Sequence, residues 1–459
     1  MYNAYVTTIK NLRKHPNADR LQLGECFGNT VCVSMEYTDN QIGVYFPTDG
    51  QLSVEFADAN NLLRKKDADG NNIGGYMDSD KRNVTSIKLR GEKSDGLFLP
   101  LSCLESFGDI STLKVGDVIT TFNGHEICTK YIPRRNIRSG HSTNGNRTRK
   151  KKMPIAPLFT EHADTEQLAY NLAAFQPGDL IEITLKMHGT SQRTGYLPVL
   201  KGYKRTFWDK IMKREGTPIY DWGYVSGTRR TVLDDWDGGF YGSNAFRKQH
   251  HDTFVGKLHK GEEVYYEVVG FTDNGTSIMG KGNNKKLGKD FVKQYGEETV
   301  FSYGCEPTGK IGVGITEEKV HQSELYVYRM TMTNEDGNIV EYTPDFMRYR
   351  CEQMGCKYVP VMWQGYIPEI ENDESLPAEM QETAGSYIMN IAEQYYAGPD
   401  PIGKTHTREG VVVRIVNKPK FCAYKHKNFE FKCLEGLVKA EADAPDMEEA
   451  QEEINEEEN

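Results

Sequence analysis

Hydrophobic and polar residues alternate in short runs along most of this chain, a pattern with a period of two that is typical of half-buried β-strands. In the first 132 residues, turn residues separate these runs at regular intervals, and Asp69-Gly70 and Asp95-Gly96 supply turn chemistry. The clearest runs cover residues 31–35, 42–46 and 86–90. Short strands spaced in this way predict a small β-barrel over residues 1–132.

Residues 154–440 combine strand patterns with helical ones. The alternating runs that predict strands lie at residues 180–185, 196–200, 264–270, 408–414 and 424–427. Residues 165–175 predict a helix, and residues 373–396 predict another, which begins at Asp373-Glu374-Ser375 and has Ile388, Ile391 and Ala392 on one face. We therefore expect an α+β, multidomain protein.

Two charged segments flank this second region. Residues 133–153 carry eight lysines and arginines and no acidic residue among Ser, Gly and Asn, which is the composition of a basic linker. Residues 441–459 carry ten acidic residues and no basic one, which predicts a disordered, self-repelling tail. Without the tail the chain holds 56 basic and 56 acidic groups, so its net charge of -10 comes from the tail alone.

The composition of the 459 residues, 37% hydrophobic and 27% charged, indicates a globular protein of two or three domains. No apolar run reaches the length of about 18 residues that a membrane span needs. The N-terminus lacks the layout of a signal peptide. The nine cysteines form no metal-ligand or CxxC pattern, so we expect reduced thiols and a cytoplasmic location. We also expect a monomer.

Candidate chemistry lies at the strand ends. Lys186 ends one predicted strand and is followed by a turn hinged at Gly189. Glu267 and Glu409 lie in later β-rich runs, and Lys425 and Lys427 lie two apart, on one face of a strand. Each feature alone is ordinary, because strand carboxylates and strand lysines are usually structural or solvated. Their order along about 240 residues is what points to a common site.

This order of motifs resembles the covalent nucleotidyltransferases, the superfamily of ATP-dependent ligases and mRNA capping enzymes. A lysine nucleophile must lose its proton, and a lysine titrates near about 10.4 in a peptide, so burial or nearby positive charge must lower its pKa. Lys425 and Lys427, or bound Mg²⁺, would supply that charge next to Lys186. The resemblance implies attack by Lys186 on the α-phosphorus of ATP, with a lysine-AMP intermediate.

The resemblance also assigns roles to the other residues. Gly189 belongs to the nucleotide-binding turn, Glu267 contacts the ribose and helps hold metal-bound water, and Glu409 organises Mg²⁺ (or Mn²⁺). Lys425 and Lys427 clamp the α-phosphate and take part in catalysis. Tyr328, in an aromatic strand with Tyr326, stacks on the adenine. Arg229 and Arg230, in a basic segment at residues 226–231, grip phosphate and RNA.

Two positions depart from the common superfamily pattern, and these departures point to one branch of the superfamily. His188 stands where an aspartate is usual, and Ser191 stands where arginine or asparagine is frequent. Residues 15–21 resemble the opening of tRNA-binding OB-folds, and residues 89–97 fit the second hairpin of that fold. These features are similar to the Deinococcus-type RNA ligases. That branch implies an N-terminal OB-like barrel followed by an ATP-grasp-like ligase domain with antiparallel sheets.

The expected function is ATP-dependent RNA ligation, which seals 3′-OH/5′-phosphate breaks or nicks in a duplex with RNA at the 3′-OH end. One alternative is a DNA ligase or a capping guanylyltransferase with the same lysine chemistry. Another is a non-catalytic tRNA- or RNA-binding protein built on residues 15–21. A DNA-end binder with a decayed catalytic domain is a weaker alternative, because Lys186 and both glutamates are intact.

Overall fold

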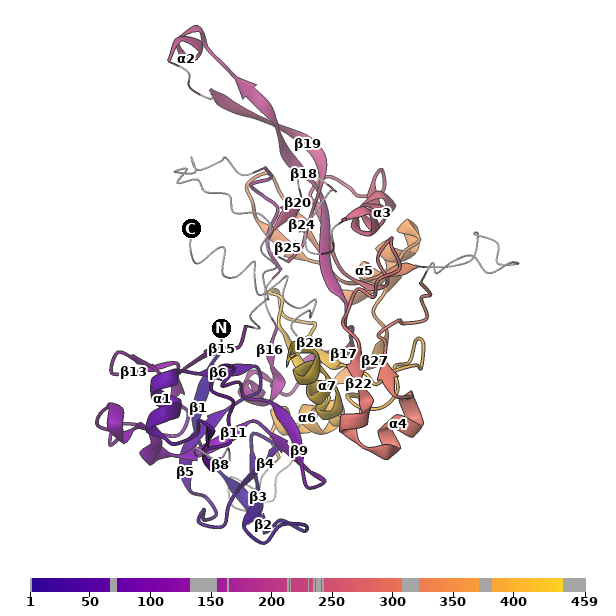
Figure 1. Cartoon of the computed structure of the whole chain (residues 1–459). Coiled ribbons are helices and arrows are strands. Elements are labelled where there is room, and N and C mark those ends of the chain that lie inside the picture. Colours follow the sequence, from indigo (N-terminus) through magenta and orange to yellow (C-terminus); the bar gives the residue numbers. More distant parts are fainter. Residues whose placement is uncertain are drawn as a thin grey trace. The chain divides into compact units, whose positions relative to one another are not determined.

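The structure is a computed structural model that describes residues 2–66, 72–132, 155–162, 165–212, 214, 216–229, 231–233, 236, 241, 243–307, 322–370 and 382–440. Its internal contacts divide the chain into two compact units. The first unit consists of Met1–Arg135, Gly282–Glu297 and Phe429–Asp443, and the second takes the rest. Figure 1 shows the helices and strands of the chain, coloured along the sequence.

The first unit is built mainly of short antiparallel strands. Its largest sheet has the order β11-β5-β1-β12, and a second sheet has the order β2-β3-β4. The strands of its N-terminal segment are β1 (Ala4–Thr8), β2 (Lys10–Lys14), β3 (Leu21–Cys26), β4 (Asn29–Ser34), β5 (Ile42–Phe46), β6 (Gly50–Leu52), β7 (Lys65–Lys66), β8 (Asn72–Gly74), β9 (Ser86–Leu89), β10 (Glu92–Asp95), β11 (Leu97–Pro100), β12 (Val118–Ile119), β13 (Thr121–Phe122), β14 (His125–Glu126) and β15 (Cys128–Lys130). Helix α1 (Val54–Ala59) and the 3-10 helix η1 (Leu101–Phe107) complete the segment.

The hydrophobic core of this segment lies between the largest sheet and the two helices, where Val44, Phe46, Phe56 and Leu104 are fully buried. The strands predicted from the sequence at 31–35, 42–46 and 86–90 are confirmed as β4, β5 and β9. Among the described residues the strands fall into separate sheets, and none of these closes on itself. The β-barrel therefore stays a prediction, and the turn residues Asp69-Gly70 lie outside the described part.

The two segments that resemble an OB-fold meet in this unit. The ring of His15 is buried, its Nδ1 accepts the backbone N–H of Asn17 at 3.0 Å, and its Nε2 lies 3.1 Å from the carbonyl oxygen of Leu89. Because Nδ1 is an acceptor, the proton is on Nε2, and His15 donates it to Leu89. The motif at residues 15–21 thus fastens a turn to the β9–β10 hairpin.

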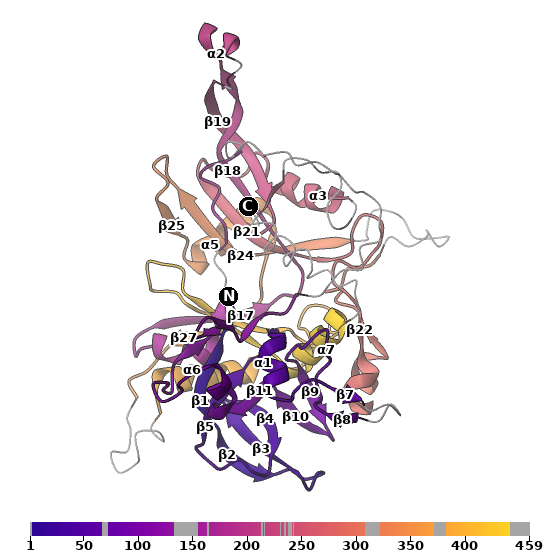
Figure 2. The same ribbon diagram turned by 60° about the vertical axis from the view of Figure 1, so that its left-hand side comes forward.

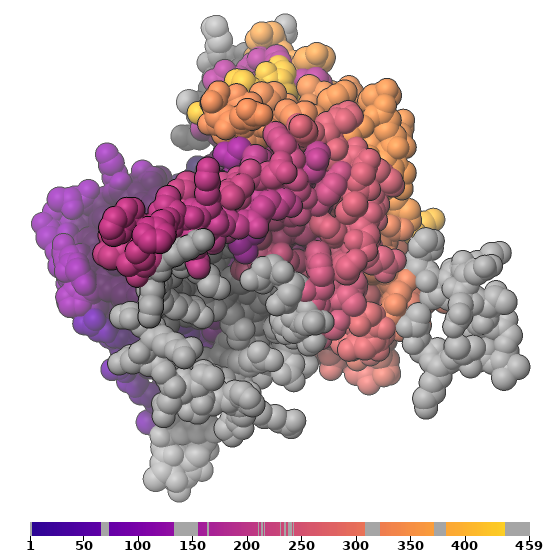
Figure 3. Space-filling model, turned by 90° about the horizontal axis from the view of Figure 1, so that it is seen from above, coloured from indigo at the N-terminus to yellow at the C-terminus, as the bar shows by residue number. Residues whose placement is uncertain are grey.

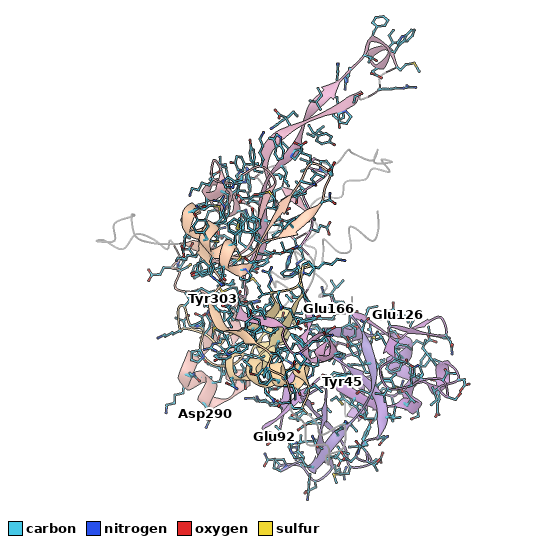
Figure 4. All side chains as sticks on the ribbon, turned by 180° about the vertical axis from the view of Figure 1, so that it is seen from behind. Tyr45, Glu92, Glu126, Glu166, Asp290 and Tyr303 are labelled. Atoms are coloured by element: carbon cyan, nitrogen blue, oxygen red, sulfur yellow. The ribbon has the colours of Figure 1, made fainter. Side chains whose placement is uncertain are left out.

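Two segments distant in sequence complete the first unit. The elements are β22 (Gly282–Asn283), the 3-10 helix η4 (Asn284–Leu287), α4 (Lys289–Tyr295) and α7 (Phe429–Ala440). Asp95 joins α7 to the strands, since its carboxylate accepts from Ser86 Oγ at 2.6 Å and pairs with Lys432, while its carbonyl accepts from Tyr45 (Figure 4). The boundary predicted at residue 440 therefore differs from the observed division, because α7 buries its apolar side chains in the first unit.

The second unit contains two larger sheets. Its strands are β16 (Glu166–Gln167), β17 (Leu180–Lys186), β18 (Thr190–Lys204), β19 (Thr217–Gly227), β20 (Val232–Leu233), β21 (Glu262–Gly270), β23 (Glu298–Thr299), β24 (Ser323–Thr333), β25 (Ile339–Glu341), β26 (Lys357–Tyr358), β27 (Val361–Tyr366), β28 (Gly410–Ile415) and β29 (Ala423–Lys427). Its helices are α2 (Phe207–Ile211), α3 (Ala245–Phe254), α5 (Pro344–Met354) and α6 (Ala384–Tyr395), with 3-10 turns η2 (Leu168–Tyr170) and η3 (Leu172–Ala174).

The two sheets are largely antiparallel, as expected. One has the order β16-β29-β28-β17-β27, and the other has the order β20-β19-β18-β21-β24-β25, with β26 beside β24. Only the short pairs β16–β29 and β24–β26 are parallel in the described residues. Helix α6 covers one face of the five-stranded sheet (Figure 2).

The alternation along β17 decides which side chains face α6. Ile181 and Ile183 are fully buried in the core with Ile388 and Ala392 of α6. Residues of a strand point to opposite faces in turn, so the polar positions of β17 face the other way. The predicted apolar face of α6 is thus confirmed, although the helix begins after Thr383, which forms a capping box with Ser386. The start predicted at residues 373–375 lies outside the described residues.

The helix predicted over residues 165–175 is wrong. This segment forms β16 and then the two 3-10 turns η2 and η3. Gln167 pairs in parallel with Lys425, and Asn171 has a φ of −128° between the two turns. The side chain of Asn171 donates to the carbonyl oxygen of Gln167 at 2.8 Å, a local bond that competes with helical hydrogen bonding.

All nine cysteines are free thiols. Among the described residues, no helix combines the length and the apolar character needed to cross a membrane.

Deleting residues 1–132 is expected to destabilise the remaining chain. Phe431 and Leu434 of α7 are fully buried and Phe429 nearly so, and Lys93 lies 4.9 Å from the ring of Phe429. Loss of the N-terminal strands would expose this apolar face to water. We expect aggregation or a lower melting temperature, measured by light scattering and calorimetry. Deleting residues 441–459 is the control, and a soluble 133–459 fragment with an unchanged melting temperature would contradict the expectation.

Candidate functional site

The candidate nucleophile Lys186 is the last residue of β17, as the sequence predicts. The turn that follows it is tight, because a Cβ on Gly189 would lie 2.4 Å from the carbonyl oxygen of Val268 and 2.9 Å from Cγ of Glu267. A glycine at this position therefore lets β17 turn into β18 directly against β21. The close approach brings Lys186 and Glu267, from two different sheets, to one place.

A buried carboxylate joins three of the candidate residues. Glu409, only 3% exposed, lies immediately before β28, and its Oε1 is 2.7 Å from Nζ of Lys186 and 3.5 Å from Nζ of Lys427. Lys186 and Lys427 both pair with Gly410 in the sheet, one on each side of β28. The sheet register thus places two ammonium groups on one carboxylate, which compensates the cost of burying its charge.

His188 lies beside this ion cluster. Its Nδ1 is 3.8 Å from Oε2 of Glu409, which is beyond hydrogen-bond distance. Its backbone N–H donates to the hydroxyl of Tyr303 at 2.7 Å, and its ring meets the ring of Phe301 edge-on at 4.6 Å. Burial raises the pKa of Tyr303, which is labelled in Figure 4, well above its ordinary value, so this hydroxyl stays neutral. Tyr303 and Phe301 therefore hold the turn after Lys186 in place.

A pocket opens between the two sheets of the second unit. It has an empty volume of about 850 Å³, which includes space open to solvent. Its charged lining is Glu182, Lys186, Arg229, Glu267, Arg348 and Arg414, and its ring-bearing lining is His162, Tyr328 and Phe421. Three of the predicted site residues besides Lys186, namely Arg229, Glu267 and Tyr328, thus share one pocket with it.

One wall of the pocket consists of rings. The ring of His162 lies 5.1 Å from that of Tyr328 and 5.5 Å from that of Phe421. Burial and the guanidinium of Arg329 lower the pKa of His162 well below its ordinary value, so its ring is neutral. Arg329 donates to Nδ1 of His162 at 3.2 Å, which leaves the proton on Nε2. This wall offers flat surfaces and a neutral N–H donor to a planar ligand.

The sequence reasoning missed several of these lining residues. Glu182 occupies a polar position of β17 and accepts from Arg348 at 2.6 Å, and Arg414 is its cross-strand partner on β28. A charged residue in an otherwise apolar strand was the signal that could have identified Glu182 and Arg414. His162 and Tyr303 lie in segments without periodicity, so the sequence held no signal for them.

The remaining predicted residues are placed as follows. Lys425 pairs with Val412, which lines the pocket, and it shares a strand face with Ala423 and Lys427, so it lies on the pocket side of β29. Ser191 Oγ lies 3.3 Å from the hydroxyl of Tyr328. Arg230 lies outside the described residues.

The described residues contain no cluster of three or more histidine, cysteine or acidic side chains that could hold a metal ion. Glu409 is a hard oxygen donor that already neutralises two cations, and Glu267 is a second carboxylate in the same region. Mg²⁺ is usually held by one or two carboxylates together with water and substrate phosphates. The residues therefore fit a divalent ion that arrives with a phosphate ligand.

Comparison with known proteins identifies the fold. No protein-family model and no curated protein matches this chain. Among solved structures, an RNA ligase from Naegleria gruberi, a variant with AMP and Mn, matches with a TM-score of 0.52 at 16% identity, covering 94% of this chain and 97% of that one. The same ligase with PPi matches with a TM-score of 0.51 at 16% identity, covering 93% and 96%. At this identity the likeness shows that the chain has the fold of that RNA ligase.

The close contact at Gly189 leads to a stability prediction. Gly189→Ala is expected to lower the free energy of unfolding by about 1–3 kcal/mol, because the new methyl group meets backbone and must displace β18 or β21. The control is Gly436→Ala in α7, where a Cβ meets only the side chain of Thr85 at 3.7 Å, and helix propensity predicts a gain. Urea unfolding measures both variants. Equal effects of the two substitutions would contradict the packing argument.

Proposed function

We propose that this protein is an ATP-dependent RNA ligase. In the first step, Nζ of Lys186 forms a bond to the α-phosphorus of ATP while the bond to the β-phosphate oxygen breaks and pyrophosphate leaves. The AMP then passes to a 5′-phosphate end. Finally, a 3′-hydroxyl attacks that activated end, the phosphodiester forms and AMP leaves. Catalysis of this kind rests mainly on positioning and on neutralisation of phosphate charge.

The observation that carries the proposal is the ion cluster at the edge of the pocket. Lys186 and Lys427 share the buried carboxylate of Glu409 at 2.7 and 3.5 Å. Lys186 itself lines the pocket, so its amine lies where a bound nucleotide can reach it. Lys427 shares the carboxylate with Lys186 and so supplies a second cation for the same phosphate, as the resemblance implies for a lysine that attacks phosphorus. The fold of a known RNA ligase agrees with this chemistry.

The other residues take roles that the resemblance implies. The planar base would lie against Tyr328 and the ring wall, and Glu267 would contact the ribose. Lys425, Lys427, Arg229 and Arg230 would bind the phosphates and the RNA backbone. Of these residues, Tyr328, Glu267 and Arg229 line the pocket, which supports their part of the proposal.

A divalent ion, Mg²⁺ or Mn²⁺, would be held by Glu409 and Glu267 and would supply positive charge to the phosphates. Glu409 would then balance the charge of the ion as well as that of the two lysines. In this arrangement Lys427 compensates part of the negative charge of Glu409, and this weakens the ion pair between Glu409 and Lys186.

For the first unit we propose an RNA-binding domain with an OB-like fold. His15 and the β9–β10 hairpin, joined by the hydrogen bond to Leu89, are the features that support it. A Deinococcus-type ligase with this domain order, acting as a monomer in the cytoplasm, remains our proposal for the subfamily.

Covalent labelling tests the first step. Incubation with ATP labelled at the α-phosphate and a divalent ion is expected to give a labelled protein band on a denaturing gel. Lys186→Ala removes the amine and Lys186→Arg keeps a permanent charge, so both variants are expected to lose at least about 99% of the label. Lys418→Ala, which removes a lysine paired with Asp179 outside the pocket, is the matched control.

The same assay separates the alternatives. Labelling by GTP instead of ATP would favour a capping guanylyltransferase. RNA binding without any covalent label would favour a non-catalytic RNA-binding protein. Undiminished labelling of a folded Lys186→Ala variant would refute the choice of nucleophile.

The substrate is tested with two nicks that differ in one sugar. We expect faster sealing when the nucleotide at the 3′-hydroxyl end carries ribose, because its 2′-hydroxyl and the A-form geometry that it favours can both be recognised. Single-turnover rates on both nicks, with the 5′-phosphate strand kept identical, measure the preference. Equal rates for ribose and deoxyribose would favour the DNA ligase alternative.

A further inference from the structure

A two-stranded arm extends from the seven-stranded sheet of the second unit. β21 pairs with β18 only from Thr190 to Gly195, whereas β19 pairs with β18 as far as Lys204. Beyond Gly195 the hairpin has no third strand among the described residues, and α2 forms its end (Figures 1 and 2). We call residues 196–224 the arm. Isolated two-stranded hairpins are marginally stable, so a chain that keeps one this long has a use for its surface.

The tip of the arm is apolar and exposed. Phe207, Trp208, Ile211 and Met212 are 72%, 70%, 54% and 59% exposed. The short helix that presents them is held by a capping box at Thr206, and not by a core beneath it. Exposed hydrophobic residues grouped in this way are typical of an interaction site. In Figure 3 the arm forms a ridge on the surface, coloured magenta.

Aromatic rings also follow one face of the arm below the tip. Tyr220, Trp222 and Tyr224 alternate along β19, and Tyr196 and Tyr203 pair with this face from β18. All five are partly exposed. The rings of Tyr196 and Tyr224 are stacked at 4.6 Å. The opposite face buries Leu197, Val199 and Val225 in a small core, so the aromatic face is the open one near the base.

Positive charge accompanies these rings. The basic residues of the arm whose side chains are described, Lys201, Lys204, Arg205 and Arg214, are all exposed. Nζ of Lys260 lies 5.2 Å from the ring of Trp222. The described acidic residues are two, and one of them, Asp209, is engaged in the capping box of α2. The arm is therefore both aromatic and cationic, although the chain outside the acidic tail has no net charge.

We infer that the arm binds a single-stranded segment of RNA next to the end or nick that the enzyme seals. Bases stack on exposed aromatic rings whatever their sequence, and lysines and arginines contact the phosphates. Side chains on one face of a strand repeat at intervals of about 6.7 Å. This interval is twice the rise of about 3.4 Å per stacked nucleotide, so each ring can meet every second base. The exposed basic side chains beside the rings favour a ligand that carries phosphates. The choice of RNA as ligand rests on the proposed function.

Binding is measured directly, without ligation. A fluorescein-labelled single-stranded RNA is titrated with full-length protein, without ATP and with a chelator, and anisotropy gives the Kd. The tip variant Phe207→Ser/Trp208→Ser is expected to bind at least about tenfold more weakly, the loss of one or two stacked bases. Lys204→Ser/Arg205→Ser is expected to reduce the slope of log Kd against log salt by about 1–2.

Two further variants serve as a second test and as a control. In the shortened arm, an Asn-Gly turn replaces residues 201–219 and joins the cross-strand partners Leu200 and Tyr220, so the register is kept. It is expected to bind at least as weakly as the tip variant. Tyr366→Ser is the matched control, because this ring is 65% exposed on β27 and lies outside both the arm and the pocket, and it is expected to bind like the wild type.

Unchanged RNA affinity in both the tip variant and the shortened arm would overturn the inference. Retained RNA affinity together with lost flotation on phosphatidylserine vesicles would make the arm a membrane-binding surface instead. Retained RNA affinity with a changed sedimentation coefficient would make it a self-association surface. If the wild type takes no label from ATP while the arm variants still lose RNA binding, the proposed ligase function fails and the inference about the arm stands.

Discussion

The two-residue repeat of β17 is the constraint on which the site depends. Ile181 and Ile183 must face α6 to complete the core, and this requirement turns Glu182, Thr184 and Lys186 toward the pocket. A slip of one residue would bury three polar groups and expose two isoleucines, so the hydrophobic effect fixes the register strongly. The position of the candidate nucleophile is therefore determined by packing on the other side of the sheet.

Glu409 adds an electrostatic constraint to this packing constraint. A carboxylate that is 3% exposed needs compensating charge, and β28 obtains it from the strand on each side, through Lys186 and Lys427. Removing either lysine leaves the other to compensate the buried charge alone. The ion cluster is thus assembled when the sheet forms, before any nucleotide arrives, and a phosphate ligand meets cations that are already positioned.

The sequence predicted the parts of this arrangement that follow from local pattern. The alternation at 180–185, the lysine at the strand end and the glycine turn are all local, and the structure has them where they were expected. The prediction of a helix at 165–175 failed because Glu166 and Gln167 pair with β29, which is far away in the sequence. His162 and Tyr303 were missed for the same reason, since each acts through contacts with residues more than 100 positions away.

The packing of α7 in the first unit is another long-range effect. It concerns the site because α7 follows β29 almost directly. A single residue, Asn428, lies between Lys427 of β29 and the first residue of α7. Asn428 is buried, its backbone N–H donates to the carbonyl oxygen of Glu409 at 2.8 Å, and its side chain donates to Thr407 at 2.9 Å. A third hydrogen bond joins the side chain of Asn428 to the carbonyl oxygen of Arg408 at 3.3 Å. These buried hydrogen bonds fix the end of β29, and with it the backbone of Lys427, beside the backbone of Glu409.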